Sequence, residues 1–222
     1  MKRITILSGL LLLTGLAVQA QEKLAEYNVR PAVAVRTPIQ GDSINFKGDK
    51  FAVANLLKTN IDLRFDGRSY ERMAADTAGY VTVKKADKDN LFYLFATNLR
   101  AERFMKAKLS ISSPARFEVF VNGESKQTKD TAEDSLSQVR PTVVSLRMEP
   151  EADYEIVIKL LSTADDKLAP ALKCEFEKEK DFAAVGYQAA PDLKRRLALH
   201  NTAFGPRVSS VSLSPNGRYL LT

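Results

Sequence analysis

Apolar and polar residues alternate in short segments from about residue 40 to residue 180, and this period of two limits the possible folds more than any other feature of the sequence. In the segment 106–111, Ala107, Leu109 and Ile111 point one way, whereas the residues between them point the other way. We expect strands at residues 80–84, 91–97, 106–111, 116–121, 143–148, 154–161 and 171–176. Short strands separated by turn signals predict a mainly β fold, a jelly-roll-like β-sandwich at residues 40–180.

Three local patterns refine this prediction. The segment 91–97 is apolar on both faces, which indicates a strand buried in the middle of the sandwich. Asn122 and Gly123 follow a predicted strand, and both residue types tolerate positive φ, so we expect a tight hairpin turn there. The segment 130–138 is polar and predicts a loop with at most one helical turn.

The first twenty residues have the pattern of a secretory signal peptide. Lys2 and Arg3 precede an apolar run at residues 4–18, which is shorter than a bilayer-spanning helix. Small residues at Val18 and Ala20 place the predicted cleavage before Gln21. The alternative is an uncleaved membrane anchor. No later segment is apolar enough to cross a membrane, so we expect an exported protein, periplasmic or extracellular, with residues 21–39 as an N-terminal extension.

The charges and the cysteine exclude several classes of function. The formal net charge is +6, but basic and acidic residues are interleaved, whereas a nucleic-acid-binding protein gathers positive charge on one face. The single cysteine, Cys174, cannot form an internal disulfide. It lies on the apolar side of the alternating segment 171–176, which indicates a buried structural thiol rather than a nucleophile. We therefore predict no nucleic-acid partner and no cysteine chemistry.

The most distinctive polar and aromatic cluster is a candidate glycan-binding site. It consists of Arg64, Phe65, Asp66, Arg68 and Tyr70, with Arg72 and Tyr80 nearby in the sequence. Sandwich modules of this type often stack sugars on exposed aromatic rings, and a strand followed by Asn122-Gly123 resembles the galactose-binding-like sandwiches of sugar-active enzymes. The alternative is that Phe65 and Tyr70 pack in the fold while Arg68 is solvated.

Metal binding has weaker candidates. Asp87, Asp89 and Asn90 form one group of oxygen ligands, and Asp165 with Asp166 forms another. Neither group has the spacing of a known calcium loop, and Cys174 and His200 alone cannot complete a zinc site. We therefore predict no metal and no cofactor.

A change in composition marks a boundary after the sandwich. The alternation stops, and residues 181–205 read as a linker with a short helix at 192–200. Residues 206–222 then read as a strand at 208–213, a Ser-Pro-Asn-Gly turn, and a second strand from Arg218. Because a lone hairpin cannot bury its own apolar face, we expect the chain to be the front of a longer protein.

The segment 212–221, Ser-Leu-Ser-Pro-Asn-Gly-Arg-Tyr-Leu-Leu, resembles the Ser-Pro-Asp-Gly-Lys motif that opens blades of secreted β-propellers. Asn216 stands for the usual Asp and Arg218 for the usual Lys. The run from Leu193 to Val208 is similar to the lead-in of the propeller in prolyl oligopeptidase and dipeptidyl peptidase IV-like serine peptidases. Exported members of this family, especially from Gram-negative bacteria, can carry an extra β domain ahead of the propeller. The resemblance implies that residues 206–222 start a truncated propeller.

The family's Ser-Asp-His triad lies on a hydrolase domain that would follow the propeller. This chain contains no Gly-x-Ser-x-Gly elbow, and its only histidine, His200, lies in the predicted linker. No catalytic residue is therefore predicted. The resemblance favours a non-catalytic accessory region of a secreted serine peptidase, with peptide substrate bound by the missing domains. The alternative functions are a glycan-binding module of a propeller protein, or a freestanding secreted protein whose hairpin pairs with another chain.

Overall fold

The computed structural model describes residues 22–37, 44, 47–65, 68–192, 212–213 and 220–221, and within them the fold is a β-sandwich. The first sheet has the spatial order β1 (Glu22–Lys23), β11 (Ala171–Lys178), β6 (Met105–Ser112) and β9 (Thr142–Met148), with β4 (Val81–Thr82) also paired to β11. The second sheet has the order β3 (Glu71–Ala74), β2 (Glu26–Val35), β5 (Asn90–Ala101), β10 (Asp153–Ser162), β7 (Arg116–Val121) and β8 (Glu124–Lys129), with β12 (Tyr187–Ala190) also paired to β5. The described strands pair antiparallel.

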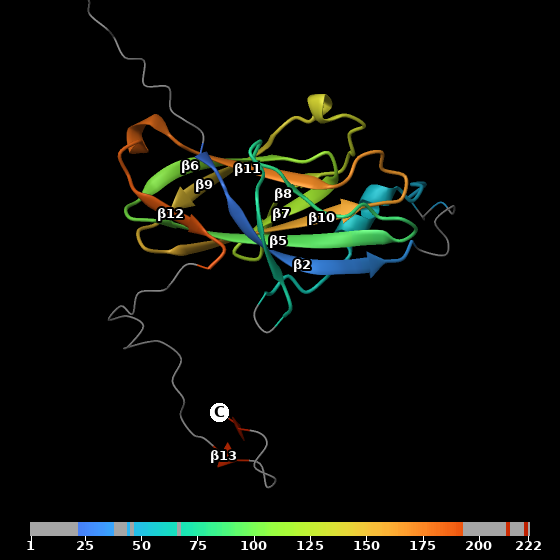
Figure 1. The fold of residues 1–222 in the computed structure, drawn as a ribbon, viewed down its shortest axis with the longest axis horizontal. Coiled ribbons are helices and arrows are strands. Elements are labelled where there is room, and N and C mark those ends of the chain that lie inside the picture. The colour runs from blue at the N-terminus through green and yellow to red at the C-terminus, as the bar shows by residue number, and fades with distance from the viewer. Residues whose placement is uncertain are drawn as a thin grey trace, which may run out of the picture.

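The chain crosses repeatedly between the two sheets. It leaves β5 for β6, returns for β7 and β8, crosses again to β9, returns for β10, crosses to β11 and returns for β12. Figure 1 shows the resulting two layers, with β2 and β5 in the lower part of the view. Most neighbouring strands are therefore distant in sequence, as in jelly rolls, although β7 and β8 form a hairpin, and this agrees with the predicted fold class.

The main core lies between the sheets and follows from the alternation. The inward residues of β6 (Ala107, Leu109 and Ile111) are buried against the second sheet's inward residues, such as Phe117 and Ile158. Cys174 is buried in this core, as predicted. Packing of both inner faces supplies the apolar burial that holds a chain with one cysteine and no disulfide.

The second sheet is also covered on its outer face. Residues 51–65, which we call the covering segment, cross over β5 and β10 there, with Leu56 and Leu57 packed on Phe92 and Leu161. Phe65 packs in a neighbouring cluster on Leu94, Ala96 and Val157. These contacts explain why the predicted strand at 91–97 is apolar on both faces, and they fix the position of the segment that carries the candidate site.

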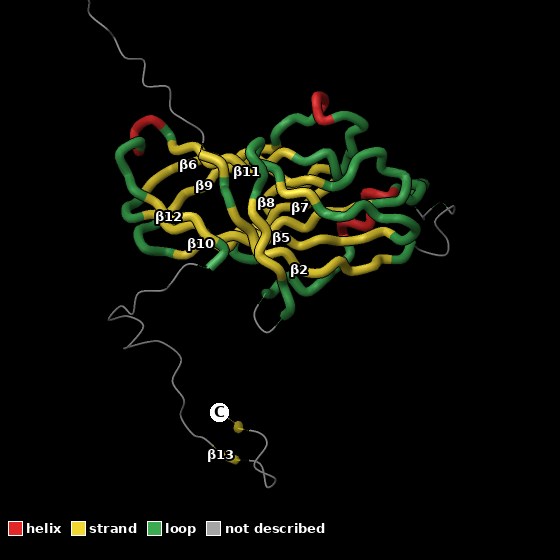
Figure 2. The backbone as a smooth tube through the Cα atoms, viewed as in Figure 1, coloured by secondary structure: helices red, strands yellow, loops and turns green. Residues whose placement is uncertain are grey.

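Helical structure in the described residues is limited to three 3-10 turns (Figure 2): η1 (Val53–Lys58), η2 (Leu136–Gln138) and η3 (Lys180–Phe182). The turn η2 lies in the segment 130–138, where we predicted at most one helical turn. Within the part of the chain that the structure describes, no helix is long and apolar enough to span a bilayer.

The seven predicted strands are present, most of them longer than predicted. Asn122 has φ 51° and Gly123 has φ 80°, so the hairpin turn is confirmed. The domain limits differ from the prediction, because β1 and β2 lie in the predicted extension at residues 21–39 and β12 lies in the predicted linker. The pattern of β2 is obscured by Pro31 and a register shift between Arg30 and Val33, after which most of its residues are exposed.

The signal peptide and the helix predicted at 192–200 fall almost entirely outside the described residues. Of the predicted C-terminal hairpin, the structure describes β13 (Ser212–Leu213) and β14 (Leu220–Leu221), which pair antiparallel. The propeller itself stays a prediction.

Candidate functional site

The candidate site lies where the covering segment reaches the β2–β3 edge of the second sheet. Residues 61–65 alternate, so that Ile61, Leu63 and Phe65 pack on the sheet while Asp62 and Arg64 point away from it. The chain then enters β3, which carries Arg72 opposite Asn28 of β2. This arrangement brings polar side chains from three segments to one surface.

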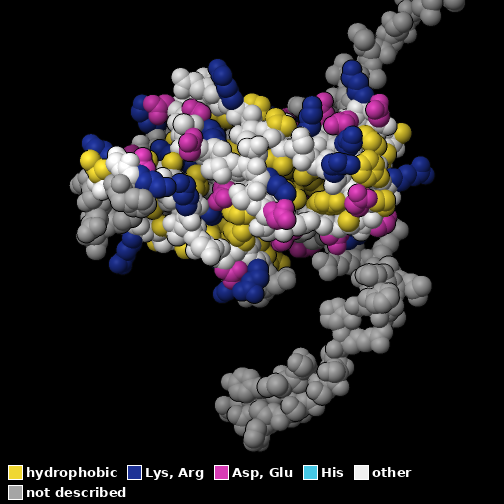
Figure 3. Space-filling model, turned by 180° about the vertical axis from the view of Figure 1, so that it is seen from behind, with side chains coloured by type: hydrophobic (Ala, Val, Ile, Leu, Met, Phe, Trp, Pro, Cys, Tyr) yellow, Lys and Arg dark blue, Asp and Glu magenta, His cyan; other side chains and the backbone are white. Residues whose placement is uncertain are grey.

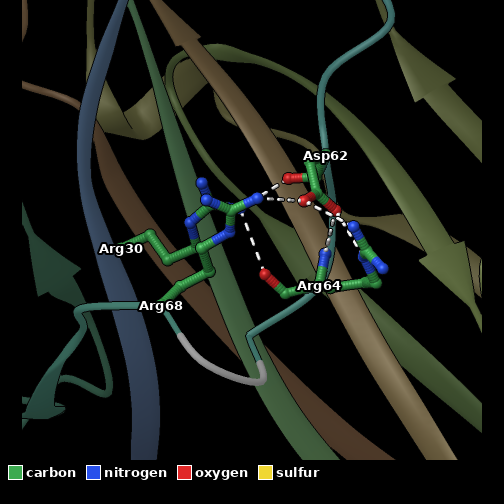
Figure 4. A network of polar contacts seen from close by, with 4 residues as sticks. All are labelled: Arg30, Asp62, Arg64 and Arg68. Atoms are coloured by element: carbon green, nitrogen blue, oxygen red, sulfur yellow. Dashed lines mark hydrogen bonds and ion pairs between the residues drawn. The ribbon is translucent and has the colours of Figure 1, made fainter. Parts of the chain in front are cut away.

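Asp62 is the centre of a network of arginines (Figure 4). Its carboxylate accepts hydrogen bonds from Arg64 Nε at 3.0 Å and Arg64 Nη2 at 3.2 Å, and from Arg68 Nη2 at 2.8 Å. Arg30 Nη1 donates to the backbone carbonyls of Asp62, at 2.5 Å, and Arg64, at 3.2 Å. The Asp62 carboxylate therefore orients the guanidinium groups of Arg64 and Arg68. The guanidinium of Arg30 binds the backbone of the segment that carries them.

These contacts explain the charge state of Asp62. The hydrogen bonds from the Arg64 side chain, the Arg64 backbone N–H and the Arg68 side chain hold the pKa of the Asp62 carboxyl well below its usual range. Asp62 is therefore ionised throughout the physiological range of pH, and the network is permanently charged.

Tyr70 is the exposed aromatic residue of this surface. Its side chain is 44% exposed, whereas Phe65 beneath it is only 8% exposed. The two ring centroids lie 6.1 Å apart at an interplanar angle of 56°. Phe65 therefore supports Tyr70 from the apolar side and leaves part of the tyrosine ring open to solvent.

Arg72 forms a second ion pair at the same edge. Its guanidinium contacts Asp192, and the same carboxylate accepts a hydrogen bond from Asn28 Nδ2 at 3.1 Å. Asn28 is buried, and its Oδ1 has no hydrogen-bond partner among the described residues. We call Arg30, Asp62, Arg64, Arg68, Tyr70 and Arg72 the arginine–tyrosine patch.

The structure brings together four of the five predicted site residues. Arg64 and Arg68 meet at Asp62, and Phe65 meets Tyr70. Asp66 lies outside the described residues. Phe65 packs in the fold, as the alternative interpretation held, but Tyr70 is exposed. Tyr80 does not join the patch, because it lies near Lys173 of the first sheet, 6.0 Å from ring centroid to Nζ.

Two residues of the patch were missed in the sequence. Asp62 could have been found from the sequence, since it lies on the same side of the alternating segment 61–65 as Arg64. Arg30 could not, because its contacts join β2 to a segment more than thirty positions away.

Three of the five calcium candidates weighed in the sequence are engaged in other contacts. Asp87 pairs with Lys84 at 3.2 Å, and Asp166 pairs with Arg116 at 2.8 Å and accepts the backbone N–H of Thr163. The Asn90 amide donates to the carbonyl of Val35. In the described ranges no cluster of three or more His, Cys, Asp or Glu side chains has the arrangement of a metal site.

A hollow lies between η1 and the β7–β8 hairpin. It has a volume of about 280 Å³ and is lined by Ala54, Asn55, Leu57, Lys58, Glu118, Thr128 and Asp130. It carries no exposed aromatic ring, so it lacks the feature that distinguishes the patch.

Charges of both signs share the face of the sandwich that Figure 3 shows. Basic and acidic side chains are intermixed over most of this face, while basic side chains gather on the loop that projects at the bottom of the view. On this face the gathering of basic side chains is therefore local.

Comparisons with known proteins give no family. No family model and no curated protein matches this chain. Solved structures similar to it include a β-glucosidase from Kluyveromyces marxianus in complex with glucose, at 11% identity over 55% of this chain and 15% of that chain, with a TM-score of 0.39. They also include a PA14 sugar-binding domain from an RTX adhesin, at 10% identity over 45% of this chain and 51% of that chain, with a TM-score of 0.31.

A family 35 carbohydrate-binding module from an environmental isolate is similar at 17% identity over 54% of this chain and 82% of that chain, with a TM-score of 0.34. This chain therefore spans a small part of the β-glucosidase and about half of the PA14 domain. All three TM-scores lie below 0.5, and the functional conclusion accordingly rests on the geometry of the arginine–tyrosine patch.

Proposed function

We propose that the sandwich is a carbohydrate-binding module and that the arginine–tyrosine patch is its binding site. The observation that carries this proposal is the Tyr70 ring, which is supported by Phe65 and open to solvent; Arg64 and Arg68, which Asp62 holds in place, precede it closely in the sequence. Exposed aromatic rings beside oriented polar groups are what a ligand with one apolar face and a polar rim requires.

A sugar ring has this character. Its C–H groups form an apolar face that gains free energy by leaving water against an aromatic ring, and its hydroxyl groups donate and accept hydrogen bonds around the rim. Tyr70 would take the apolar face. Arg64, Arg68 and the carboxylate of Asp62 would take the hydroxyl groups, and their mutual contacts lower the entropy lost on binding.

The location of the patch suits a polymer. The three side chains of Arg64, Arg68 and Tyr70 are exposed at the surface, so an extended chain of sugars can lie across them without threading into a cavity. An exported location, which the N-terminal sequence predicts, would give the module access to polysaccharides outside the cytoplasm.

The test is affinity electrophoresis of the chain through gels that contain a panel of neutral and charged polysaccharides. Tyr70→Ala should weaken retention by about tenfold or more, because aromatic residues commonly dominate a binding surface, whereas Tyr70→Phe should keep most of it. Val143→Ala is the matched control, since Val143 is 43% exposed and lies on β9 of the other sheet. Equal retention of Tyr70→Ala and the unmodified chain would refute the proposed site.

The peptidase-accessory function remains a second prediction. The pairing of β13 with β14 supports the hairpin on which the resemblance rests. The two functions are compatible, since a glycan-binding module can precede a catalytic domain. Peptide cleavage by a longer form of the protein, lost on removal of residues 22–192, would support the accessory function.

A further inference from the structure

The strand β9 forms an open edge of the first sheet. Its seven residues, Thr142–Met148, pair with β6 without a register shift, and no described strand pairs with its other side. In an antiparallel sheet, every second residue of an edge strand directs its backbone N–H and C=O away from the neighbouring strand. Among the residues that the structure describes, the backbone of β9 has no hydrogen-bond partner beyond β6. These groups are therefore placed to pair with a further strand.

The other open edges of the two sheets have features that oppose such pairing. The outer strands β1, β3, β4 and β12 are only two to four residues long. The edge strand β8 carries Glu124, Lys126 and Lys129 and has a register shift, and the part of β2 beyond β3 contains Pro31 and a register shift. Short length, charge, proline and bulges are the usual means by which sheets avoid pairing between molecules. Among the described edges, β9 is long and regular, has no proline and carries one charged residue, Arg147.

The sequence of β9 is complementary to itself in an antiparallel arrangement. If all seven residues pair with those of a second copy, Ser145 lies opposite the Ser145 of that copy, and Val143 lies opposite Arg147. Val144 then lies opposite Leu146, and both are buried core residues, so the core sides of the two strands coincide. No like charges lie directly opposite each other, which is the arrangement that would disfavour the pair.

The same pairing covers an apolar side chain that is exposed in the single chain. Val143 is 43% exposed on the outer side of β9. In the paired strands, the aliphatic part of Arg147 from the second copy lies beside Val143, while its guanidinium stays in water. Because the arrangement has two-fold symmetry, this contact occurs twice.

We propose that β9 pairs with β9 of a second copy of this chain, so that the first sheets of two sandwiches join into one continuous antiparallel sheet. The proposal does not depend on the proposed function. The arginine–tyrosine patch lies at the β2–β3 edge of the second sheet, opposite the edge formed by β8, which is the strand of that sheet nearest to β9. The dimer therefore leaves both patches accessible, and a polymer that reaches both is held more strongly than by one.

The first experiment uses Ser145, which lies on the two-fold axis. The Cβ atoms of the two Ser145 residues would lie about 4.5–5.5 Å apart, close to the distance that a disulfide bridges. The two Val143 residues would be separated by the length of strand from Val143 to Arg147, about 14 Å. With copper–phenanthroline as oxidant, Ser145→Cys should form a disulfide-linked dimer of the full chain on a non-reducing gel, whereas Val143→Cys should not. The unmodified chain is the control, because its only cysteine, Cys174, is buried.

Charged variants test the register without a covalent bond. Ser145→Lys places two ammonium groups opposite each other and should raise the dissociation constant of the dimer about fivefold. Val143→Glu places a carboxylate opposite Arg147 and should lower it about threefold, because the new ion pair forms twice. Val143→Ala keeps this pair of positions free of opposed charges and should leave the dimer in place. Sedimentation equilibrium of the full chain measures each constant, and the melting temperatures should stay close to that of the unmodified chain, since Ser145 and Val143 are exposed.

Three outcomes would overturn the inference. A chain that stays monomeric while Ser145→Cys fails to cross-link would show that β9 takes no second copy, and an extended peptide would then be the partner to test. Cross-linking of Val143→Cys as rapid as that of Ser145→Cys would contradict the register. A dimer that Ser145→Lys leaves unchanged would be formed by another surface. None of these results bears on glycan binding, which the Tyr70→Ala comparison tests separately.

Discussion

Lys159 holds the covering segment on the second sheet. It lies on the outer face of β10, where its Nζ donates to the carbonyl of Leu57 at 2.5 Å and pairs with Glu118 at 2.7 Å. The ammonium also lies 5.6 Å from the ring centroid of Phe92 and 5.3 Å from that of Phe120. Because this side chain ties η1 to the sheet in addition to the packing of Leu56 and Leu57, its removal should weaken the attachment of the segment that carries Asp62 and Arg64.

The size of the effect follows from burial. The Lys159 side chain is 4% exposed and that of Glu118 is 17% exposed. Removal of one partner from a buried ion pair costs about 3–5 kcal/mol, and the partial exposure of Glu118 places Lys159→Met near the lower limit, at about 3 kcal/mol. With a urea slope of about 2 kcal/mol per molar, the midpoint of unfolding should fall by about 1.5 M.

Equilibrium urea unfolding followed by circular dichroism measures this shift. Lys84→Met is the matched control, because Lys84 pairs with Asp87 in a fully solvated position, and its loss should cost less than about 1 kcal/mol. The double variant Lys159→Met with Glu118→Leu should recover part of the stability, since it removes the carboxylate left without its partner. A cost below about 1 kcal/mol for Lys159→Met alone would refute the anchoring role.

Three further outcomes are expected. Burial raises the pKa of the Cys174 thiol to about 12, so Ellman's reagent should react with it only after unfolding, and rapid reaction in the folded chain would contradict its position. Since the unfolded thiol loses its proton near pH 9 while the folded thiol keeps it, the thiol should contribute a fall of about 1.4 kcal/mol per pH unit in the free energy of unfolding from there towards pH 12, and Cys174→Ala should make the slope shallower by that amount; an unchanged slope would contradict the assignment. Because its arginine contacts hold the pKa of Asp62 well below its usual range, retention by a polysaccharide that the chain binds should persist from pH 7 to about pH 4, and a decline centred near pH 5 would argue against the network.

Much of the sandwich could be predicted from the sequence, because its central strands have one side in the core and show the period of two. Segments that lack one side in the core, or that alternate without pairing in a sheet, were predicted less accurately. The strand β2 contains Pro31, a register shift and an exposed second half, so its alternation is broken. The covering segment alternates at residues 61–65, but it lies on a sheet instead of pairing within one, and a period of two does not distinguish these arrangements.

The candidate site was predictable only where it is local in sequence. Arg64, Phe65, Arg68 and Tyr70 are neighbours along the chain, and their composition identified them. The contact of Arg30 with the same segment depends on which strand lies beside it in the folded sheet, and that is a property of the topology. Likewise, Lys159 interrupts an apolar strand, yet only the fold shows that its ammonium pairs with Glu118 and donates to the carbonyl of Leu57.

The most direct test of ligand binding at the arginine–tyrosine patch is a two-dimensional ¹H–¹⁵N NMR titration of the full chain with an oligosaccharide of the polymer that it retains. Binding at the patch predicts shifts concentrated in the amides of residues 28–30, 61–65 and 68–72, with β6, β9 and β11 of the first sheet unaffected. Shifts centred on the hollow lined by Asn55, Glu118 and Asp130, or on the outer face of the first sheet, would contradict it and place the ligand elsewhere.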